Sequence, residues 1–162
     1  MSEATPSKNP LLDERGLPRF GEIRVEHVEP GMRECLSELE RKLEILEREV
    51  EPTWAGSVDR LERIGDRLGT RWGIVSHLLG VKNDPALRAA HEAVQPEVVR
   101  FGIRAAQSRP LYDAFVALQK GPGAAELEPA QRRIVDVLVR DAVLAGVGLD
   151  GARKQRVVGA SP

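Results

Sequence analysis

The chain has 162 residues, of which 41% are hydrophobic and 30% are charged, as in an ordinary globular domain with its own core. It contains 24 Lys and Arg and 25 Asp and Glu, so its formal net charge of -1 gives no basis for binding nucleic acid or an anionic membrane. Aromatic residues make up only 4%, which argues against a surface that stacks on bases.

The cellular compartment is indicated by what the sequence lacks. Cys35 is the single cysteine, so no disulfide can form within the chain, which is typical of a reducing compartment. The N-terminus, "MSEATPSKNP", has no apolar run of the kind found in signal peptides, and no stretch approaches the length of a membrane span. We therefore predict a soluble, cytoplasmic protein.

The first thirty residues are not predicted to form a regular helix. Residues 1–10 are polar and small, and we expect them to be disordered. Residues 11–30 contain several prolines and glycines between short apolar pieces, which predicts an extended arm packed on the body of the domain.

The first predicted helix covers residues 31–50. Its apolar residues recur at steps of three and four and form one stripe, while Glu38 with Lys42 and Glu44 with Arg48 lie four apart on the charged side. Pro52 ends the helix. The members of the stripe are Met32, Cys35, Leu36, Leu39, Leu43, Leu46 and Val50.

The second predicted helix, over residues 54–81, has an apolar stripe of the same kind that includes Trp54 and Trp72. Gly65, Gly69 and Gly73 repeat every four residues along it, although each glycine costs about 1 kcal/mol relative to alanine in a helix. The repeat indicates either close approach of another helix or a local kink.

Three further helices are predicted from their start signals. Asp84 followed by proline opens a helix over residues 85–107, which Pro96 should kink. Ser108 precedes a short helix over residues 111–119, and Glu128 followed by proline opens the last helix, over residues 129–145. The segment "RIVDVLV" alternates like a strand, but the charges around it lie four residues apart and favour a helix.

These elements predict an all-α fold: an antiparallel helical domain of about five helices, over residues 31–150, with an extended N-terminal arm. The sequence contains no convincing strand and no internal repeat.

The stretch "HEAVQ", from His91 to Gln95, stops one residue short of the H-E-x-x-H motif that binds zinc on a helix. The three histidines are His27, His77 and His91, and no two of them lie four residues apart. An amide is a poor zinc ligand beside imidazole, so we interpret "HEAVQ" as a surface or boundary His-Glu pair on a kinked helix rather than as a zinc site.

Other candidate sites are also incomplete. Cys35 lies on an apolar stripe, where a free cysteine usually acts as a small hydrophobe. Ser76 and His77 are adjacent on a helix and point about 100° apart, so they do not form a nucleophile and base pair. We assign no catalytic, cofactor-binding or metal-ligating residue to this chain.

The order and spacing of several segments carry a family resemblance. Residues 9–31 ("NPLLDERGLPRFGEIRVEHVEPG"), 52–98 ("PTWAGSVDRLERIG…AAHEAVQPEV"), 111–118 ("LYDAFVAL") and 127–149 ("LEPAQRRIVDVLVRDAVLAGVGL") resemble the N-terminal region of oligopeptidase A-type members of the thimet oligopeptidase family of zinc metallopeptidases. The resemblance extends from Asn9 to Gln155, nearly the whole chain.

The resemblance implies a helical cytoplasmic enzyme that cuts short peptides in a deep channel. The family's H-E-x-x-H helix and downstream glutamate lie in a C-terminal catalytic half beyond the matched region. We therefore expect no cofactor in this chain, zinc in the parent enzyme, the missing catalytic half as partner, and no activity of the chain alone. Residues 151–162 are expected to be a truncated tail.

Two alternatives remain open. A free-standing copy of this region would be a helical protein-interaction module, since it would expose apolar surface. A metal-binding helical bundle that uses Cys35 and the three histidines is also conceivable, although no local ligand pair supports it.

Overall fold

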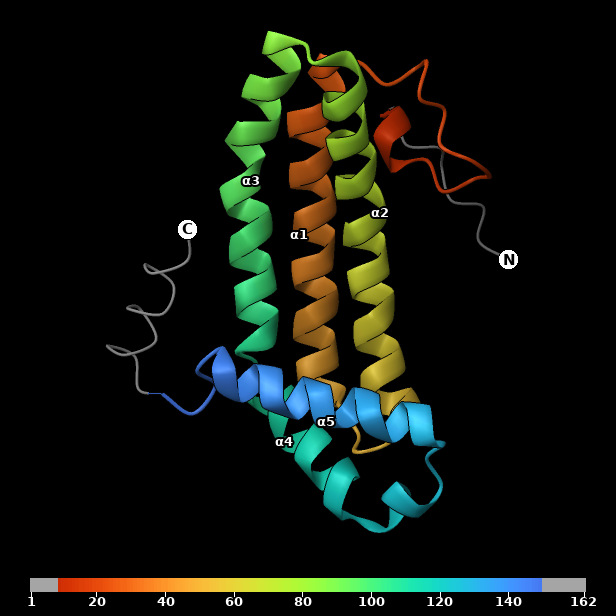
Figure 1. Cartoon of the computed structure of the whole chain (residues 1–162), viewed down its shortest axis with the longest axis vertical. Helices are drawn as coiled ribbons and strands as arrows, with labels where there is room; N and C mark the ends of the chain where they lie inside the picture. Colours follow the sequence, from red (N-terminus) through yellow and green to blue (C-terminus); the bar gives the residue numbers. More distant parts are fainter. Residues whose placement is uncertain (1–8, 150–162) are drawn as a thin grey trace. The chain divides into compact units, whose positions relative to one another are not determined.

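The computed structural model describes residues 9–149, in which five α-helices and three short helical turns account for the regular structure (Figure 1). The α-helices are α1 (Val25–Glu49), α2 (Asp59–Lys82), α3 (Pro85–Ala106), α4 (Arg109–Lys120) and α5 (Pro129–Leu144). The turns are η1 (Pro10–Leu12), η2 (Trp54–Val58) and η3 (Pro122–Ala125). These residues contain no strand, so the all-α prediction is confirmed, and "RIVDVLV" is part of α5.

Two predictions concern the ends of the chain. The expected truncated tail, residues 151–162, lies outside the described residues, as does most of the expected disordered segment 1–10. Pro10 of that segment begins η1, and the Asn9 side chain caps the turn by accepting a hydrogen bond from the backbone N–H of Leu11. None of the helices in residues 9–149 is long and apolar enough to cross a membrane.

The predicted start of the first helix was wrong. α1 begins at Val25 rather than at Gly31, so residues 25–30 are helical and do not belong to the extended arm. Pro30 lies inside the helix, where it removes one backbone hydrogen bond. Val28 and Met32, on either side of it, are completely buried, and their burial offsets that loss.

The apolar stripe of α1 is buried as predicted except at Val50, which is partly buried and lies beyond the end of the helix at Glu49. Seven side chains at steps of three and four are each at most 7% exposed. The other side of α1 carries charged residues, among them Arg33, whose guanidinium contacts Glu29 on the same helix and Glu97 on α3. The buried members of the stripe are Val28, Met32, Cys35, Leu36, Leu39, Leu43 and Leu46.

The described chain divides into two compact units, one made of residues 9–39 and 65–98 and the other of residues 40–64 and 99–149. In the first unit, the arm packs with the three helices around one core. The core contains Leu11 and Ile23 from the arm, Val28 and Met32 from α1, Ile74, Val75 and Leu78 from α2, and Leu87, Ala90 and Val94 from α3.

The arm is also fixed to α2 by charged residues. Arg71 of α2 is 6% exposed, and its guanidinium donates to the Glu14 carboxylate of the arm and to the backbone carbonyl of Arg67. The Arg67 side chain contacts the same Glu14 carboxylate and also Glu38 of α1. Since burying a guanidinium is costly unless it is paired, this contact needs Glu14 in place.

In the second unit, α4 and α5 pack against each other (Figure 1), and α4 also packs on η2 and η3. η2 is a tight turn before α2. Thr53 caps it by accepting from the backbone N–H of Gly56 at 2.9 Å, and the buried Ser57 hydroxyl donates to the Thr53 carbonyl at 2.6 Å. The Trp54 ring nitrogen donates to Asp59 at 2.9 Å and links η2 to α2.

The start signals of two helices act as the sequence predicts. The Asp84 carboxylate accepts from the backbone N–H groups of Ala86 at 2.7 Å and Leu87 at 3.2 Å, at the start of α3. At the start of α5, the backbone N–H of Glu128 donates to the Gln131 side chain at 2.9 Å.

The face of α2 that carries Gly65, Gly69 and Gly73 is not packed against another helix of the described residues. A Cβ atom added to Gly65, Gly69 or Gly73 would meet nothing within 4 Å, so no helix of the described part of the chain approaches this face. At Gly56 of η2, by contrast, a Cβ atom would lie 2.7 Å from the Thr53 hydroxyl and 2.8 Å from the Glu51 Cβ.

We predict opposite effects of alanine at these positions. Gly69→Ala should stabilise the fold by about 1 kcal/mol, because alanine is the better helix former and the space is open. Gly56→Ala should destabilise it by about 1 to 2 kcal/mol, because the methyl group displaces the Thr53 cap. Urea unfolding of both variants tests this, and a destabilised Gly69→Ala variant would contradict an open face.

We also predict that Arg71→Met loosens the arm. The variant keeps the apolar contacts of the stem but loses the hydrogen bonds to Glu14 and Arg67, so tryptic cleavage after Arg15 or Arg19 should become about tenfold faster. Arg63→Met is the matched control, since Arg63 lies on the same helix, is 77% exposed and contacts Asp59 instead. Equal cleavage rates in both variants would show that Arg71 does not hold the arm.

Candidate functional site

Each of the three histidines has its own structural contact. His27 accepts a hydrogen bond from the backbone N–H of Arg24 through Nδ1 at 3.1 Å. His77 packs on Phe20 of the arm, with ring centroids 5.3 Å apart, and His91 stacks on Trp72 at 4.2 Å. Within residues 9–149, no group of three or more His, Cys, Asp or Glu side chains is placed to hold a metal ion.

"HEAVQ" lies on α3, with His91 half-buried against α2 and with Glu92 and Gln95 exposed. The imidazole thus serves as an aromatic packing surface for Trp72. Within the described part of the chain, the imidazole of His91 does not join other metal-binding side chains in the arrangement that a zinc ion needs.

A contact that the sequence did not predict joins Ser76 and His91. The Ser76 hydroxyl oxygen lies 3.5 Å from the Nε2 atom of His91, so the partner of Ser76 is a histidine on α3 and not its neighbour His77. A working nucleophile and base pair lies at about 2.6 to 3.2 Å. The separation is longer than that, and the contact depends on the register between two helices, for which sequence periodicity gives no signal.

Cys35 is buried in the first unit with 2% of its surface exposed. Burial raises the pKa of its thiol above the ordinary value, because the thiolate would lose its hydration. The thiol therefore stays protonated at neutral pH, which makes it a poor nucleophile.

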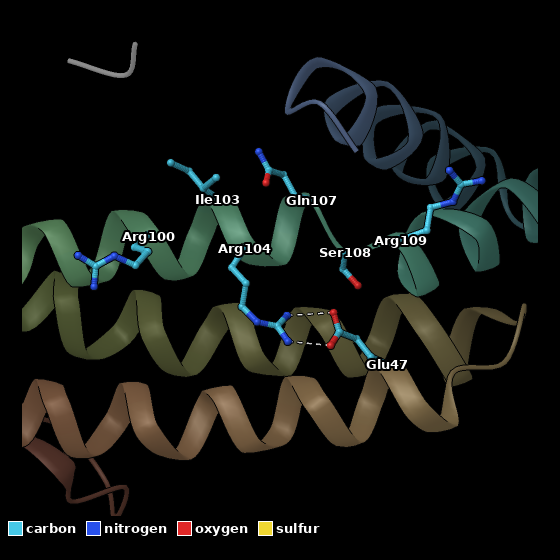
Figure 2. Close-up of a pocket in the computed structure, with 7 residues that line it drawn as sticks. All are labelled: Glu47, Arg100, Ile103, Arg104, Gln107, Ser108 and Arg109. Atoms are coloured by element: carbon cyan, nitrogen blue, oxygen red, sulfur yellow. Dashed lines mark hydrogen bonds and ion pairs between the residues drawn. The ribbon is translucent and has the colours of Figure 1, made fainter. Parts of the chain in front are cut away.

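The second unit contains an open cavity of about 360 Å³ around the junction of α3 and α4 (Figure 2). Figure 2 shows Arg104 and Glu47 pointing toward each other, whereas Ile103 and Gln107 point to the other side of α3. The lining residues are Glu47, Arg100, Ile103, Arg104, Gln107, Ser108 and Arg109.

Arg104 and Arg109, two of the arginines that line this cavity, are each paired with carboxylates. The Arg104 guanidinium donates to both carboxylate oxygens of Glu47, at 2.9 and 2.8 Å, and contacts Glu40 at 3.1 Å. Its hydrogen bonds hold the pKa of Glu47 below the ordinary value of 4.5, and the same bonds raise the pKa of Arg104. Arg109 is bound by Asp113, at 2.9 and 3.0 Å.

Two polar residues complete the junction. The Gln107 amide donates to the carbonyl of Ala145 at 2.8 Å, which ties the end of α3 to the turn after α5. Ser108 is 5% exposed; its hydroxyl stabilises the Glu47 carboxylate to a small extent but makes no well-oriented hydrogen bond within the described residues. These groups fix the junction of helices, and they do not converge on a point where a substrate atom could react.

We predict that Glu47→Gln lowers the stability of the fold at pH 7 by about 1 kcal/mol, a modest value because the pair is partly exposed to water. Since the folded-state pKa of Glu47 is lowered, its contribution is present above pH 4.5 and is lost as the pH falls through the folded-state pKa. The difference between wild type and variant should therefore shrink below pH 4.5.

Chemical denaturation at pH 7 and at several lower pH values measures this difference. Glu34→Gln is the control, since Glu34 is an exposed residue of the same helix, and its stability should stay within about 0.5 kcal/mol of wild type. A pH-independent difference for Glu47→Gln would show that the carboxylate charge is not what Arg104 binds.

Comparison with known proteins gives a consistent result. The family model described as "Neurolysin/Thimet oligopeptidase, N-terminal domain" matches residues 32–154. The chain is 45% identical over 155 residues to "Organellar oligopeptidase A, chloroplastic/mitochondrial" of Arabidopsis thaliana, covering 96% of the chain and 20% of that protein. It is 45% identical over 154 residues to "Probable cytosolic oligopeptidase A" of the same plant, covering 95% of the chain and 22% of that protein.

Bacterial relatives are also similar, among them "Oligopeptidase A" of Escherichia coli (strain K12), 36% identical over 149 residues, which are 91% of the chain and 22% of that protein. The chain thus spans about a fifth of the length of the curated relatives it matches. With the family model covering most of its residues, this chain belongs to the neurolysin/thimet oligopeptidase family and corresponds to the N-terminal region of oligopeptidase A.

Proposed function

We propose that this chain is the N-terminal helical domain of an oligopeptidase A-like zinc metallo-endopeptidase that cleaves short peptides. The observation that carries the proposal is the match to the family's N-terminal domain over residues 32–154, together with relatives that are named oligopeptidase A and are about five times longer. The proposed domain, expected over residues 31–150, begins at residue 25 with α1, and the arm of residues 11–24 packs on it.

In this proposal the zinc and the residues that activate water lie in the other part of the parent enzyme. The described residues support that assignment through the chemistry of their side chains. The histidines pack separately on Phe20, on Trp72 and on the backbone near Arg24, and Cys35 is a buried, protonated thiol. Such a donor set does not fit a catalytic zinc site.

The role left for this domain is mechanical: it forms one wall of the substrate channel and supports the catalytic part. The long helices suit that role because their apolar side chains are buried between them. Ion pairs also join charged side chains of different helices. We also propose a cytosolic location, for which the relative named "Probable cytosolic oligopeptidase A" is the support; the other plant relative is named as organellar.

A helical interaction module is the second candidate function. It is favoured by apolar side chains that stay exposed on α5, of which Leu144 is 73% exposed. Size-exclusion chromatography over a range of concentrations separates the two, since a module that binds copies of itself gives a mass that rises with concentration.

We predict that the purified chain hydrolyses no short peptide above the rate of buffer. A chimera should be active: the Arabidopsis cytosolic enzyme, with its aligned segment of 154 residues replaced by this chain, should cleave the same peptide within about tenfold of the natural enzyme. Chelator-sensitive hydrolysis by the chain alone would refute the assignment of the zinc site to the other part of the enzyme.

A further inference from the structure

Helix α5 is more apolar than its packing within the chain requires. More than half of its 16 residues are Ala, Val, Ile or Leu, yet only Val135 and Ala142 are buried. The neighbouring helix α4 buries Leu111, Ala114, Phe115 and Leu118 within 12 residues. The apolar side chains of α4 are thus buried in the core of its own unit. α5, in contrast, has apolar side chains that the described residues leave exposed.

These side chains gather on one side of α5. At about 100° per residue, Ile134, Val137 and Leu144 lie within about 80° of one another around the helix. Ile134 is 39% exposed, Leu144 is 73% exposed, and Val137 is partly buried. We call these three residues the outer seam of α5.

The other residues in the arc of the outer seam include one charged side chain. Asp141 is the one charged residue within its arc, and it is bound by Arg140 at 2.9 Å, so its charge is already balanced. Val143, although 55% exposed, lies about 180° from Ile134 around the helix and does not belong to the seam.

The comparisons indicate what covers such a face. The relatives have about four fifths of their length outside the matched region, and the match to the family's N-terminal domain extends to residue 154. The residues from Leu144 to that boundary span at most about 35 Å when fully extended. A part of the parent protein that is tethered so close to the seam is present at a high effective concentration.

We propose that the outer seam of α5 is the surface on which the part of the parent peptidase that follows residue 154 docks, through an apolar surface of its own. This inference rests on the proposed function, since it requires this chain to act as the N-terminal domain of a longer peptidase. It goes beyond that function by naming the helix face that makes the contact.

The test measures the reactivity of single cysteines. Leu144→Cys and the matched control Val143→Cys place thiols about 100° apart around the helix, one within the seam and one outside it, at two neighbouring exposed positions. Each variant is made in the isolated chain and in the Arabidopsis chimera, and the rate of maleimide labelling at that residue is measured by mass spectrometry. The native Cys35 is buried and reacts slowly in both proteins.

We expect Cys at position 144 to react at least tenfold more slowly in the chimera than in the isolated chain, and Cys at position 143 to react equally in both. Equal rates for position 144 in an active chimera would overturn the docking surface and leave the proposed function intact. A protected position 144 in a folded but inactive chimera would support the docking surface and count against the proposed function.

Two further outcomes are decided by separate measurements. If the chimera does not fold, the residue aligned with Leu144 is replaced by cysteine in the unaltered Arabidopsis cytosolic enzyme, where fast labelling refutes the inference and slow labelling supports it. If position 144 becomes protected in the isolated chain as its concentration rises, while the chimera stays labelled, the seam binds a second copy of the chain and the inference is wrong.

Discussion

Burial of the apolar stripe of α1 is the constraint on which the rest of the structure depends. Val28 and Met32 contribute to the core of the first unit, and Leu43 and Leu46 are buried in the second, so a single helix supplies core residues to both. The stripe is strictly periodic and its opposite side is charged, which fixes the orientation of α1 about its own axis. Each helix that packs on the stripe then turns its own charged side outward.

The polar contacts follow from that orientation. Arg71 and Arg104 each lie where a charged side chain meets a packed helix surface, and each is satisfied by carboxylates from another segment. In both clusters cations and anions neutralise one another. That arrangement is typical of groups that hold segments in place, and it contrasts with the unbalanced, converging charges that catalysis requires. Both clusters therefore join segments of the chain that lie far apart in the sequence.

The sequence predicts features that depend on neighbouring residues better than features that depend on contacts between distant segments. Caps such as Asp84 act within a few residues, so the starts of α3 and α5 were predicted closely. The start of α1 was missed because Pro30 is an unfavourable local signal that burial of Val28 and Met32 outweighs. Contacts between helices depend on their relative register, which periodicity does not contain.

The same limit applies to the candidate sites. In the sequence, the histidine next to Ser76 is His77. In the structure, however, the Ser76 hydroxyl lies beside His91, on another helix. Likewise, the pairing of Glu47 with Arg104 joins residues far apart in the sequence, and neither carries a local motif. The motifs of nucleophilic and zinc catalysis have local parts that a sequence displays, whereas contacts between helices have no such local signal.

The division of the chain into interleaved units has a consequence for its synthesis. A chain emerges from the ribosome with its N-terminal end first, so α1 appears before every helix that covers its stripe. The first unit needs residues 65–98, and the second needs residues beyond 99, so neither is complete when α1 and α2 alone have emerged. The stripe of α1 therefore lacks its covering helices early in translation, and all residues of the first unit emerge before the last residues of the second.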